Sequence, residues 1–356
     1  MKASGKKIAL PLILLIILCL TLSAIIGFVL YLRAKDAAYV PYRATPSPDI
    51  TSEPQAAVPS SAPAPSVTVS PVPAAEATPS PVWQFSTNAE RFWSDGALFL
   101  SDSYRSPDLT VTVKTVVDTV TFNRRVTYYV ADIYVRDITA IRTESCMDDF
   151  TKTGHGSVER TAKRVNALIA ISGDYYGARR DSLVIRNGEV YRAGLRNNMD
   201  ICLLLKDGTM ETYRAGTISL SKILEKDVWQ AWQFGPVLLK ANGDSRTSFP
   251  ESTIFVRNPR CVIGYCEPGH YKFVVVDGRQ KASRGVTLPE LSQLMVSLGC
   301  AQAFNLDGGA SAHFYWNDEI YSNPSGGGRQ MSDIIYIAKE DYPASPYHHG
   351  KDGIDE

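Results

Sequence analysis

The sequence predicts an α+β fold, in which a strand-rich mixed sheet with a few packed helices follows a transmembrane helix and a disordered linker. Three observations support this class. The N-terminal region holds a long uncharged apolar segment, and a run rich in Pro, Ala, Ser and Thr comes next. The remainder alternates short β-branched runs with turn residues, as strands and hairpins do. That remainder is long enough for one large domain.

The N-terminal segment is predicted to cross a membrane. Residues 8–32 contain no charged side chain, and about 25 apolar residues suffice to span a bilayer. Lys2, Lys6 and Lys7 precede the span and favour a cytoplasmic N-terminus. We therefore expect residues 1–35 to form a cytoplasmic tip and a signal anchor, with the C-terminal domain extracellular at the cell membrane. A cleaved signal peptide is the alternative, although its apolar region is normally only about 7–15 residues long.

Composition sets the remaining boundaries. Residues 36–82 are expected to be an extended Pro/Ala/Ser/Thr-rich linker outside the cell, since such a segment cannot build a core. Residues 83–345 should form the folded domain, and residues 346–356 a polar tail. The chain has 37 basic and 37 acidic residues without a basic stripe, which argues against a nucleic-acid partner. The odd number of cysteines after the anchor argues against a complete disulfide framework.

Periodicity and turn chemistry predict the elements of the domain in order. Alternating β-branched residues predict strands at 110–121 and 127–135, and a serine start predicts a helix at 157–166. Short apolar runs predict further strands at 167–171, 261–266, 271–276 and 332–338. Hairpin turns are expected at Asn187-Gly188, Asp207-Gly208 and Asn317-Asp318.

The segment 287–298 carries the clearest helix signals. Thr287 is a capping residue, Pro289 suits the first turn, and Glu290 completes a capping box. This helix leads directly into a predicted strand around Phe304. An apolar segment there runs into Asn305-Leu306-Asp307-Gly308-Gly309-Ala310-Ser311, where glycines allow positive φ and let a backbone approach a ligand closely. A turn alone would not account for the whole string.

Similar polar and glycine-rich segments follow other apolar runs. The segments that share this feature are Ile171-Ser172-Gly173-Asp174-Tyr175-Tyr176, Phe234-Gly235-Pro236-Val237-Leu238, Asn258-Pro259-Arg260-Cys261-Val262-Ile263-Gly264, Val276-Asp277-Gly278-Arg279 and Gly328-Arg329-Gln330-Met331-Ser332-Asp333. Together with the Asn305–Ser311 string, they resemble the signature of the phosphodiester glycosidase family, whose animal members remove N-acetylglucosamine from a phosphodiester link. The resemblance covers residues 128–339. It implies an enzyme that hydrolyses a sugar-1-phosphodiester, here in an envelope or extracellular glycan.

The chemistry of this reaction indicates which residues are candidates. An oxocarbenium-like sugar needs a carboxylate near its anomeric carbon, and phosphate oxygens suit guanidinium donors. We expect Asp307 to act as nucleophile or general base with Asp277 assisting, and Asp174 is a third candidate. The phosphate- and substrate-binding candidates are Arg260, Arg279, Arg329, Asn305, Gly308, Gly309 and Ser311.

Each candidate also has a structural interpretation. Asp307 could cap its own turn, Arg260 could form a structural ion pair, and Arg329 could be a solvated loop residue. His155 and His313 are expected to be structural rather than catalytic. No cofactor and no metal are predicted, with a divalent cation such as calcium left open. Two alternative functions remain: a non-catalytic module that binds cell wall or polysaccharide, and a transferase in exopolysaccharide assembly.

Overall fold

The computed structural model describes residue 85 and residues 88–249 and 256–339. The predicted anchor (1–35), linker (36–82) and polar tail (346–356) lie outside these residues. Within the described part of the chain, no helix is both long enough and apolar enough to cross a membrane.

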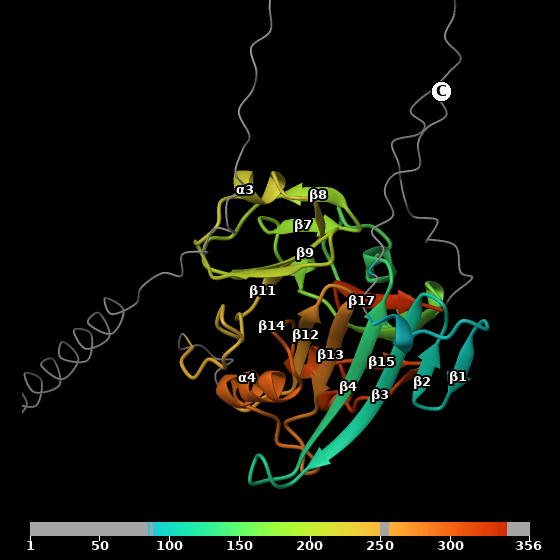
Figure 1. The fold of residues 1–356 in the computed structure, drawn as a ribbon. Coiled ribbons are helices and arrows are strands. Elements are labelled where there is room, and N and C mark those ends of the chain that lie inside the picture. Colours follow the sequence, from blue (N-terminus) through green and yellow to red (C-terminus); the bar gives the residue numbers. More distant parts are fainter. Residues whose placement is uncertain (1–84, 86–87, 250–255, 340–356) are drawn as a thin grey trace, which may run out of the picture. The chain divides into compact units, whose positions relative to one another are not determined.

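Three antiparallel sheets form the domain (Figure 1). The first sheet has the strand order β1-β2-β3-β4-β13-β12-β14. Its strands are β1 (Leu98–Leu100), β2 (Ser103–Arg105), β3 (Leu109–Asp118), β4 (Val126–Val135), β12 (Arg260–Glu267), β13 (His270–Val276) and β14 (Gln302–Asn305).

The two other sheets have five strands each. The second, ordered β10-β9-β11-β7-β8, consists of β7 (Leu183–Arg186), β8 (Glu189–Ala193), β9 (Asp200–Leu205), β10 (Met210–Tyr213) and β11 (Val228–Phe234). The third, ordered β16-β15-β6-β17-β5, consists of β5 (Arg142–Ser145), β6 (Ala167–Ser172), β15 (Phe314–Trp316), β16 (Glu319–Ile320) and β17 (Asp333–Ala338).

The strand-rich class is confirmed, but the expected mixed sheet is wrong. Every strand pairing among the described residues is antiparallel. Short turns connect many neighbouring strands, and a two-residue hairpin can only join antiparallel partners. The three predicted hairpins are of this kind: β7–β8, β9–β10 and β15–β16.

Three α-helices and five short 3-10 helices complete the described domain. The α-helices are α2 (Val158–Arg164), α3 (Leu220–Leu224) and α4 (Leu288–Ser297); the 3-10 helices are η1 (Ala89–Arg91), η2 (Ile138–Ala140), η3 (Tyr176–Ala178), η4 (Gly309–Ser311) and η5 (Ser325–Gly327). The predicted capping box of α4 is present, because Thr287 accepts from the Glu290 amide and Glu290 accepts from Thr287 N. The predicted helix 157–166 is α2, capped by Ser157.

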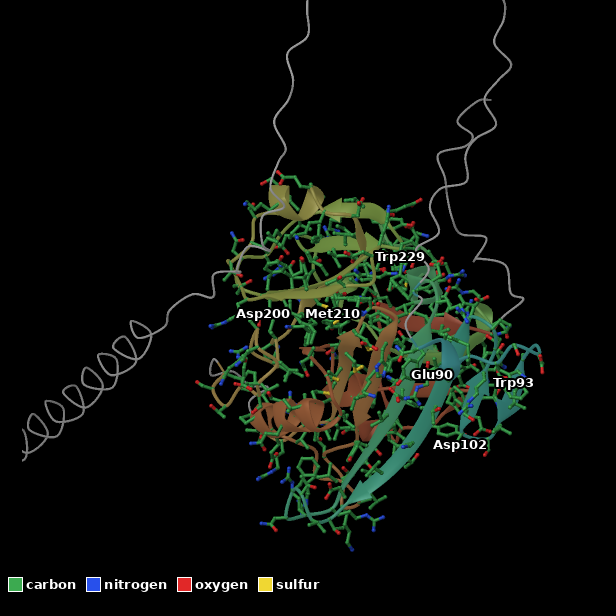
Figure 2. The ribbon with its side chains drawn as sticks, in the orientation of Figure 1. Glu90, Trp93, Asp102, Asp200, Met210 and Trp229 are labelled. Atoms are coloured by element: carbon green, nitrogen blue, oxygen red, sulfur yellow. The ribbon has the colours of Figure 1, made fainter. Side chains whose placement is uncertain are left out.

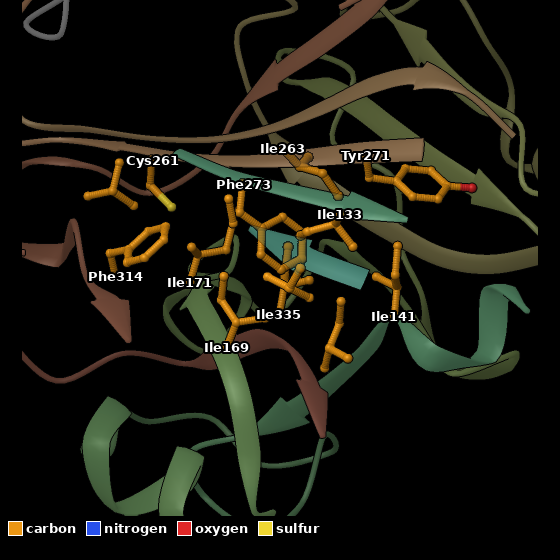
Figure 3. Close-up of a cluster of buried hydrophobic side chains, with 14 of the residues drawn as sticks. Ile133, Ile141, Ile169, Ile171, Cys261, Ile263, Tyr271, Phe273, Phe314 and Ile335 are labelled. Atoms are coloured by element: carbon orange, nitrogen blue, oxygen red, sulfur yellow. The ribbon is translucent and has the colours of Figure 1, made fainter. Parts of the chain in front are cut away.

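The first and third sheets pack face to face between two helices. Their shared core includes Ile169 and Ile335 of the third sheet against Phe273 of the first (Figure 3). The other face of the first sheet packs against α4, and the other face of the third sheet against α2. Strands β13 and β6 are therefore buried on both faces, which explains why they read as continuous apolar runs.

The second sheet supports the loop that follows β11. Figure 2 shows Asp200, Met210 and Trp229 on its strands. Trp229 Nε1 donates to the Ile141 carbonyl at 2.7 Å, which ties the sheet to the main core. Asp200 Oδ2 accepts from Val237 N at 2.8 Å and so fixes the segment after the cis Gly235-Pro236 bond.

Candidate active site

The site residues gather at one end of the strands of the first sheet, where β13 and β14 end and β12 begins. Arg260 lies opposite Val276 in the ladder, and Val262 lies opposite Asn305. Asp277 and Asp307 therefore follow two strands that flank β12 on either side. Two strand spacings separate their backbones, roughly 10 Å.

The glycine turn after β14 is fitted closely to the β12 backbone. A Cβ on Gly308 would lie 2.7 Å from the Pro259 carbonyl oxygen, so no other residue fits there. Gly309 has φ +67°, and its amide donates to the same carbonyl at 2.9 Å. The Gly309 amide is thus used inside the turn and is not available to a phosphate, contrary to the expectation for that residue.

This turn places Asp307 in a buried position at the meeting point of the first and third sheets. Its amide donates to the Gly173 carbonyl at 3.0 Å, just beyond β6. Burial raises the pKa of the Asp307 carboxyl above its ordinary value, and the nearby Arg329 charge opposes that rise. The Arg329 guanidinium donates to Asp307 Oδ2 at 2.6 Å. The Asp307 carboxyl is therefore held by a guanidinium in a setting with little water.

Arg329 connects several predicted residues. Its Nε donates to Ser311 Oγ, and its guanidinium lies 4.7 Å from the centre of the Tyr175 ring. The Arg329 side chain is still 45% exposed, so it can contact a ligand while it holds Asp307. Three of the candidate residues, Asp307, Ser311 and Arg329, are thus in contact with one another through Arg329.

His155 and Tyr175 form an aromatic wall beside this ion pair. Their rings stack with centroids 4.8 Å apart, and Tyr175 has the left-handed φ of +67° that is unusual for a bulky residue. His155 Nε2 is buried and has no hydrogen-bond partner among the described residues. Burial lowers the pKa of His155, so the neutral imidazole is favoured. This atom is suited to a ligand hydroxyl or phosphate oxygen, a role that the sequence did not single out.

Arg179 is a site residue that sequence reasoning missed. Its guanidinium lies 5.6 Å from the centre of the Tyr175 ring and donates to the Asp174 carbonyl at 3.1 Å. Burial lowers the pKa of Arg179, whereas the Asp174 and Asp307 charges raise it. The available signal was its place two residues after the Asp174-Tyr175-Tyr176-Gly177 segment.

Asp277 forms the second carboxylate centre. Its Oδ2 accepts from the Tyr129 hydroxyl at 3.0 Å, and its Oδ1 accepts from Asn323 N at 3.0 Å. Burial raises the pKa of Asp277, and these two hydrogen bonds oppose the rise. No cation pairs with Asp277 within the described ranges, unlike Asp307. Tyr129 and Asn323 come from distant parts of the sequence, and no motif marked them.

One loop reaches both carboxylates. The segment 322–329 contains Asn323, which donates to Asp277, and Arg329, which pairs with Asp307. Gln280, three residues after Asp277, donates to the Asn323 backbone carbonyl, and its Oε1 accepts from the Asn323 side-chain Nδ2 at 2.6 Å. The loop therefore joins the two carboxylates that the sequence proposed as partners.

The structure places Asp174 in a buried ion-pair network. Its Oδ1 lies 3.0 Å from Arg186 Nη2, which also lies 3.0 Å from Asp333 Oδ2, and all three side chains are fully buried. The other oxygen of Asp174 accepts from Gln233 N at 2.8 Å. Because both oxygens are engaged inside the protein, we interpret Asp174 as a positioning residue.

Among the remaining residues predicted to bind the substrate, Arg260 and Asn305 are buried, whereas Arg279 is exposed. Arg260 is buried and donates to the carbonyls of Val286 and Val256, and burial lowers its pKa to about 10 with the Arg279 charge adding to the effect. Asn305 Nδ2 donates to the Gly235 carbonyl at 2.8 Å. The side chains of Arg260 and Asn305 thus bind backbone carbonyls and hold the segments next to the strand ends in place.

Arg279 is exposed, and its Nε donates to Asn258 Oδ1 at 3.0 Å. Its Nη2 lies 3.2 Å from the position that a Cβ of Gly309 would occupy, so its guanidinium rests against the glycine turn. In the described part of the chain, no group of three His, Cys, Asp or Glu side chains is arranged to hold a metal ion.

Part of this chain is similar to known proteins. The model of the phosphodiester glycosidase family matches residues 165–338. The SPbeta prophage-derived protein YomE of Bacillus subtilis (strain 168) is 29% identical over 202 residues, which are 54% of this chain and 31% of that protein. N-acetylglucosamine-1-phosphodiester alpha-N-acetylglucosaminidase of Bos taurus is 28% identical over 188 residues, 48% of this chain and 35% of that protein. The match thus spans about a third of each of these relatives.

A solved structure shares the fold. The catalytic domain of the zebrafish N-acetylglucosamine-1-phosphodiester alpha-N-acetylglucosaminidase, auto-inhibited by its pro-peptide, superposes with a TM-score of 0.52. Its sequence is 22% identical, and the match covers 68% of this chain and 87% of that one. Residues 165–338 of this chain therefore form a domain that matches the phosphodiester glycosidase family model.

Proposed function

We propose that this protein hydrolyses the bond between a sugar anomeric carbon and a phosphodiester oxygen. The observation that carries the proposal is the buried Asp307 carboxylate, held by a half-exposed arginine beside a closely fitted glycine turn. In this reaction the C1–O bond breaks, water supplies the new hydroxyl at C1, and a phosphate monoester leaves. The names of the bovine and zebrafish relatives support N-acetylglucosamine as the sugar.

The two carboxylates suit different roles. Asp307 pairs with Arg329, so its ionised form is stabilised, and it acts as the nucleophile or as the base that activates water. Burial raises the pKa of both carboxyls, but only Asp307 has a cationic partner among the described residues, so we assign to Asp277 the proton that assists departure of the phosphate. Arg329 contacts the phosphate through the exposed part of its guanidinium, and Arg179 adds positive charge behind the Tyr175 ring.

The decisive experiment uses the full chain with an α-N-acetylglucosamine-1-phospho-sugar diester as substrate. We expect wild type to release free N-acetylglucosamine and Asp307→Asn to lose at least roughly a hundredfold in kcat/KM, because a neutral amide is neither a base nor a nucleophile. Asp102→Asn, which changes an exposed carboxylate on the β1–β2 turn, is the matched control (Figure 2). Full turnover by Asp307→Asn would remove this residue from the mechanism. Release by none of the proteins would favour a non-catalytic binding module.

The proposal places the substrate in an envelope or extracellular glycan. The uncharged segment 8–32 and the Pro-rich segment after it support an anchored domain outside the membrane. Protease added to intact cells should therefore degrade the domain while a cytoplasmic marker survives. Protection of the domain until the cells are lysed would contradict this location.

A further inference from the structure

A strongly basic hollow adjoins the glycine turn and plays no part in the mechanism above. It has a volume of about 650 Å³ and is lined by Arg124, Arg257, Arg279, Gln280, Lys281 and Arg284. Five of these six side chains are cationic, and none is acidic. The whole chain carries no net charge, so this local excess of positive charge is not a consequence of overall composition. Such a surface attracts anions.

Among the described residues, Glu290 pairs with cations of the hollow, and its one negative charge neutralises only a small part of their charge. Glu290 binds Arg124 through both oxygens at 2.7 and 2.8 Å, and one oxygen lies 3.9 Å from Arg257 Nη2. Glu290 is also engaged in the capping box of α4. Within the described ranges, Lys281 and Arg284 are exposed and form no ion pair. Several cations thus remain available to an anion from solution.

Two contacts join the hollow to the candidate active site. Arg279 lines the hollow and rests against Gly309, two residues beyond Asp307. Gln280 lines it as well and is bonded to Asn323, whose amide donates to Asp277. A chain that occupies the hollow therefore passes within reach of both carboxylates.

We propose that the hollow binds a second phosphate group of a glycan chain with repeated phosphodiester links, so that the substrate is a polyanionic polymer rather than a small diester. This inference rests on the proposed function. The phosphate at the cleaved bond is bound by Arg329, and a small diester has no further anion to place among the other cations. Guanidinium groups match phosphate oxygens with paired hydrogen bonds, and arginine supplies four of the five cations.

The test assays the full-length protein with two substrates. One is a small α-N-acetylglucosamine-1-phosphodiester with a neutral aglycone, and the other is a linear oligomer of N-acetylglucosamine-1-phosphate repeats. The variant is Arg257→Gln/Lys281→Gln/Arg284→Gln, which changes exposed side chains only. The matched control is Arg105→Gln/Arg160→Gln/Lys222→Gln, which removes the same three charges from exposed positions outside the hollow. We expect the variant to lower the ratio of kcat/KM for the oligomer to that for the small diester by roughly tenfold or more. The control should leave the ratio within about twofold of wild type.

Equal loss on both substrates, or the same loss in the control, would overturn the proposal. Titration calorimetry with the oligomer separates this outcome from failure of the proposed function, because binding does not require turnover. If wild type cleaves neither substrate, the proposed hydrolysis fails. Oligomer binding that is then at least tenfold weaker in the variant than in the control would still support the basic hollow, and equal affinity in both would overturn it.

Discussion

Arg329 contacts three different groups of the candidate site. It pairs with the Asp307 carboxylate, donates to the Ser311 hydroxyl and lies over the Tyr175 ring. Its charge is the largest influence that opposes the rise in the pKa of Asp307 caused by burial. Arg329 is therefore expected to control both phosphate binding and the protonation of Asp307.

Replacement of Arg329 by glutamine should change the pH profile as well as the rate. Without the guanidinium, the pKa of Asp307 rises further, so the acid limb of kcat/KM moves to higher pH. At the pH optimum, kcat/KM should fall roughly tenfold to a hundredfold through the lost phosphate contact. The measurement is a pH–rate profile of Arg329→Gln beside wild type, with Asp102→Asn as control. A variant whose acid limb stays in place would show that Arg329 does not set the ionisation of Asp307.

Among the elements, those defined by local chemistry were predictable. Local sequence signals, each spanning only a few residues, predict these elements. They are strands β3, β4 and β13, helix α4 with its capping box, and the three hairpins. The glycine-rich segments at strand ends single out Asp307, Ser311 and Arg329 as separate candidates, but the bonds of Arg329 to the other two are visible only in the structure. The mixed sheet was wrong, because a sequence pattern identifies a strand without specifying the direction of its neighbours.

Other features of the elements depend on contacts between distant segments. Tyr129 reaches Asp277 across 148 positions of sequence, and Arg186 reaches Asp333 across 147. No turn or glycine signal marks Tyr129 in β4, and the Asn187-Gly188 turn that follows Arg186 indicates a hairpin without indicating an ion pair. Asp174 appeared to be a catalytic candidate because it follows a strand, yet its carboxylate is engaged by Arg186 of the neighbouring sheet. Only the packing of the sheets distinguishes such a residue from one that faces a ligand.

At the scale of the whole molecule, the network of Asp174, Arg186 and Asp333 joins the second and third sheets. Two carboxylates share one guanidinium in a fully buried setting. Burial raises the pKa of Asp333 from its ordinary 3.8 to about 7, and the Asp174 charge adds to the rise while Arg186 opposes it. The native state consequently retains a proton that the unfolded chain releases at lower pH.

The sign of the resulting pH dependence follows from this difference. Since the native pKa of Asp333 is the higher one, its contribution to stability is complete below about pH 4 and is lost as pH rises through about 7. Asp333→Asn cannot titrate, so the free energy of unfolding should fall less between pH 4 and 7.5 in the variant than in wild type. Urea unfolding at a series of pH values measures both slopes. Equal slopes would show that Asp333 does not hold the proton.

The loop at residues 322–329 has a consequence for how the two acids titrate. Its amide at Asn323 responds to the charge of Asp277, and its guanidinium at Arg329 responds to the charge of Asp307. We expect ionisation of one carboxyl to strengthen its bond to the loop and so to alter the position of the donor that serves the other. By thermodynamic reciprocity, the shift that ionisation of Asp277 causes in the proton affinity of Asp307 must equal the shift that ionisation of Asp307 causes in the proton affinity of Asp277. The two carboxyls would then behave as one diprotic acid, with the loop as the connection between its two protons.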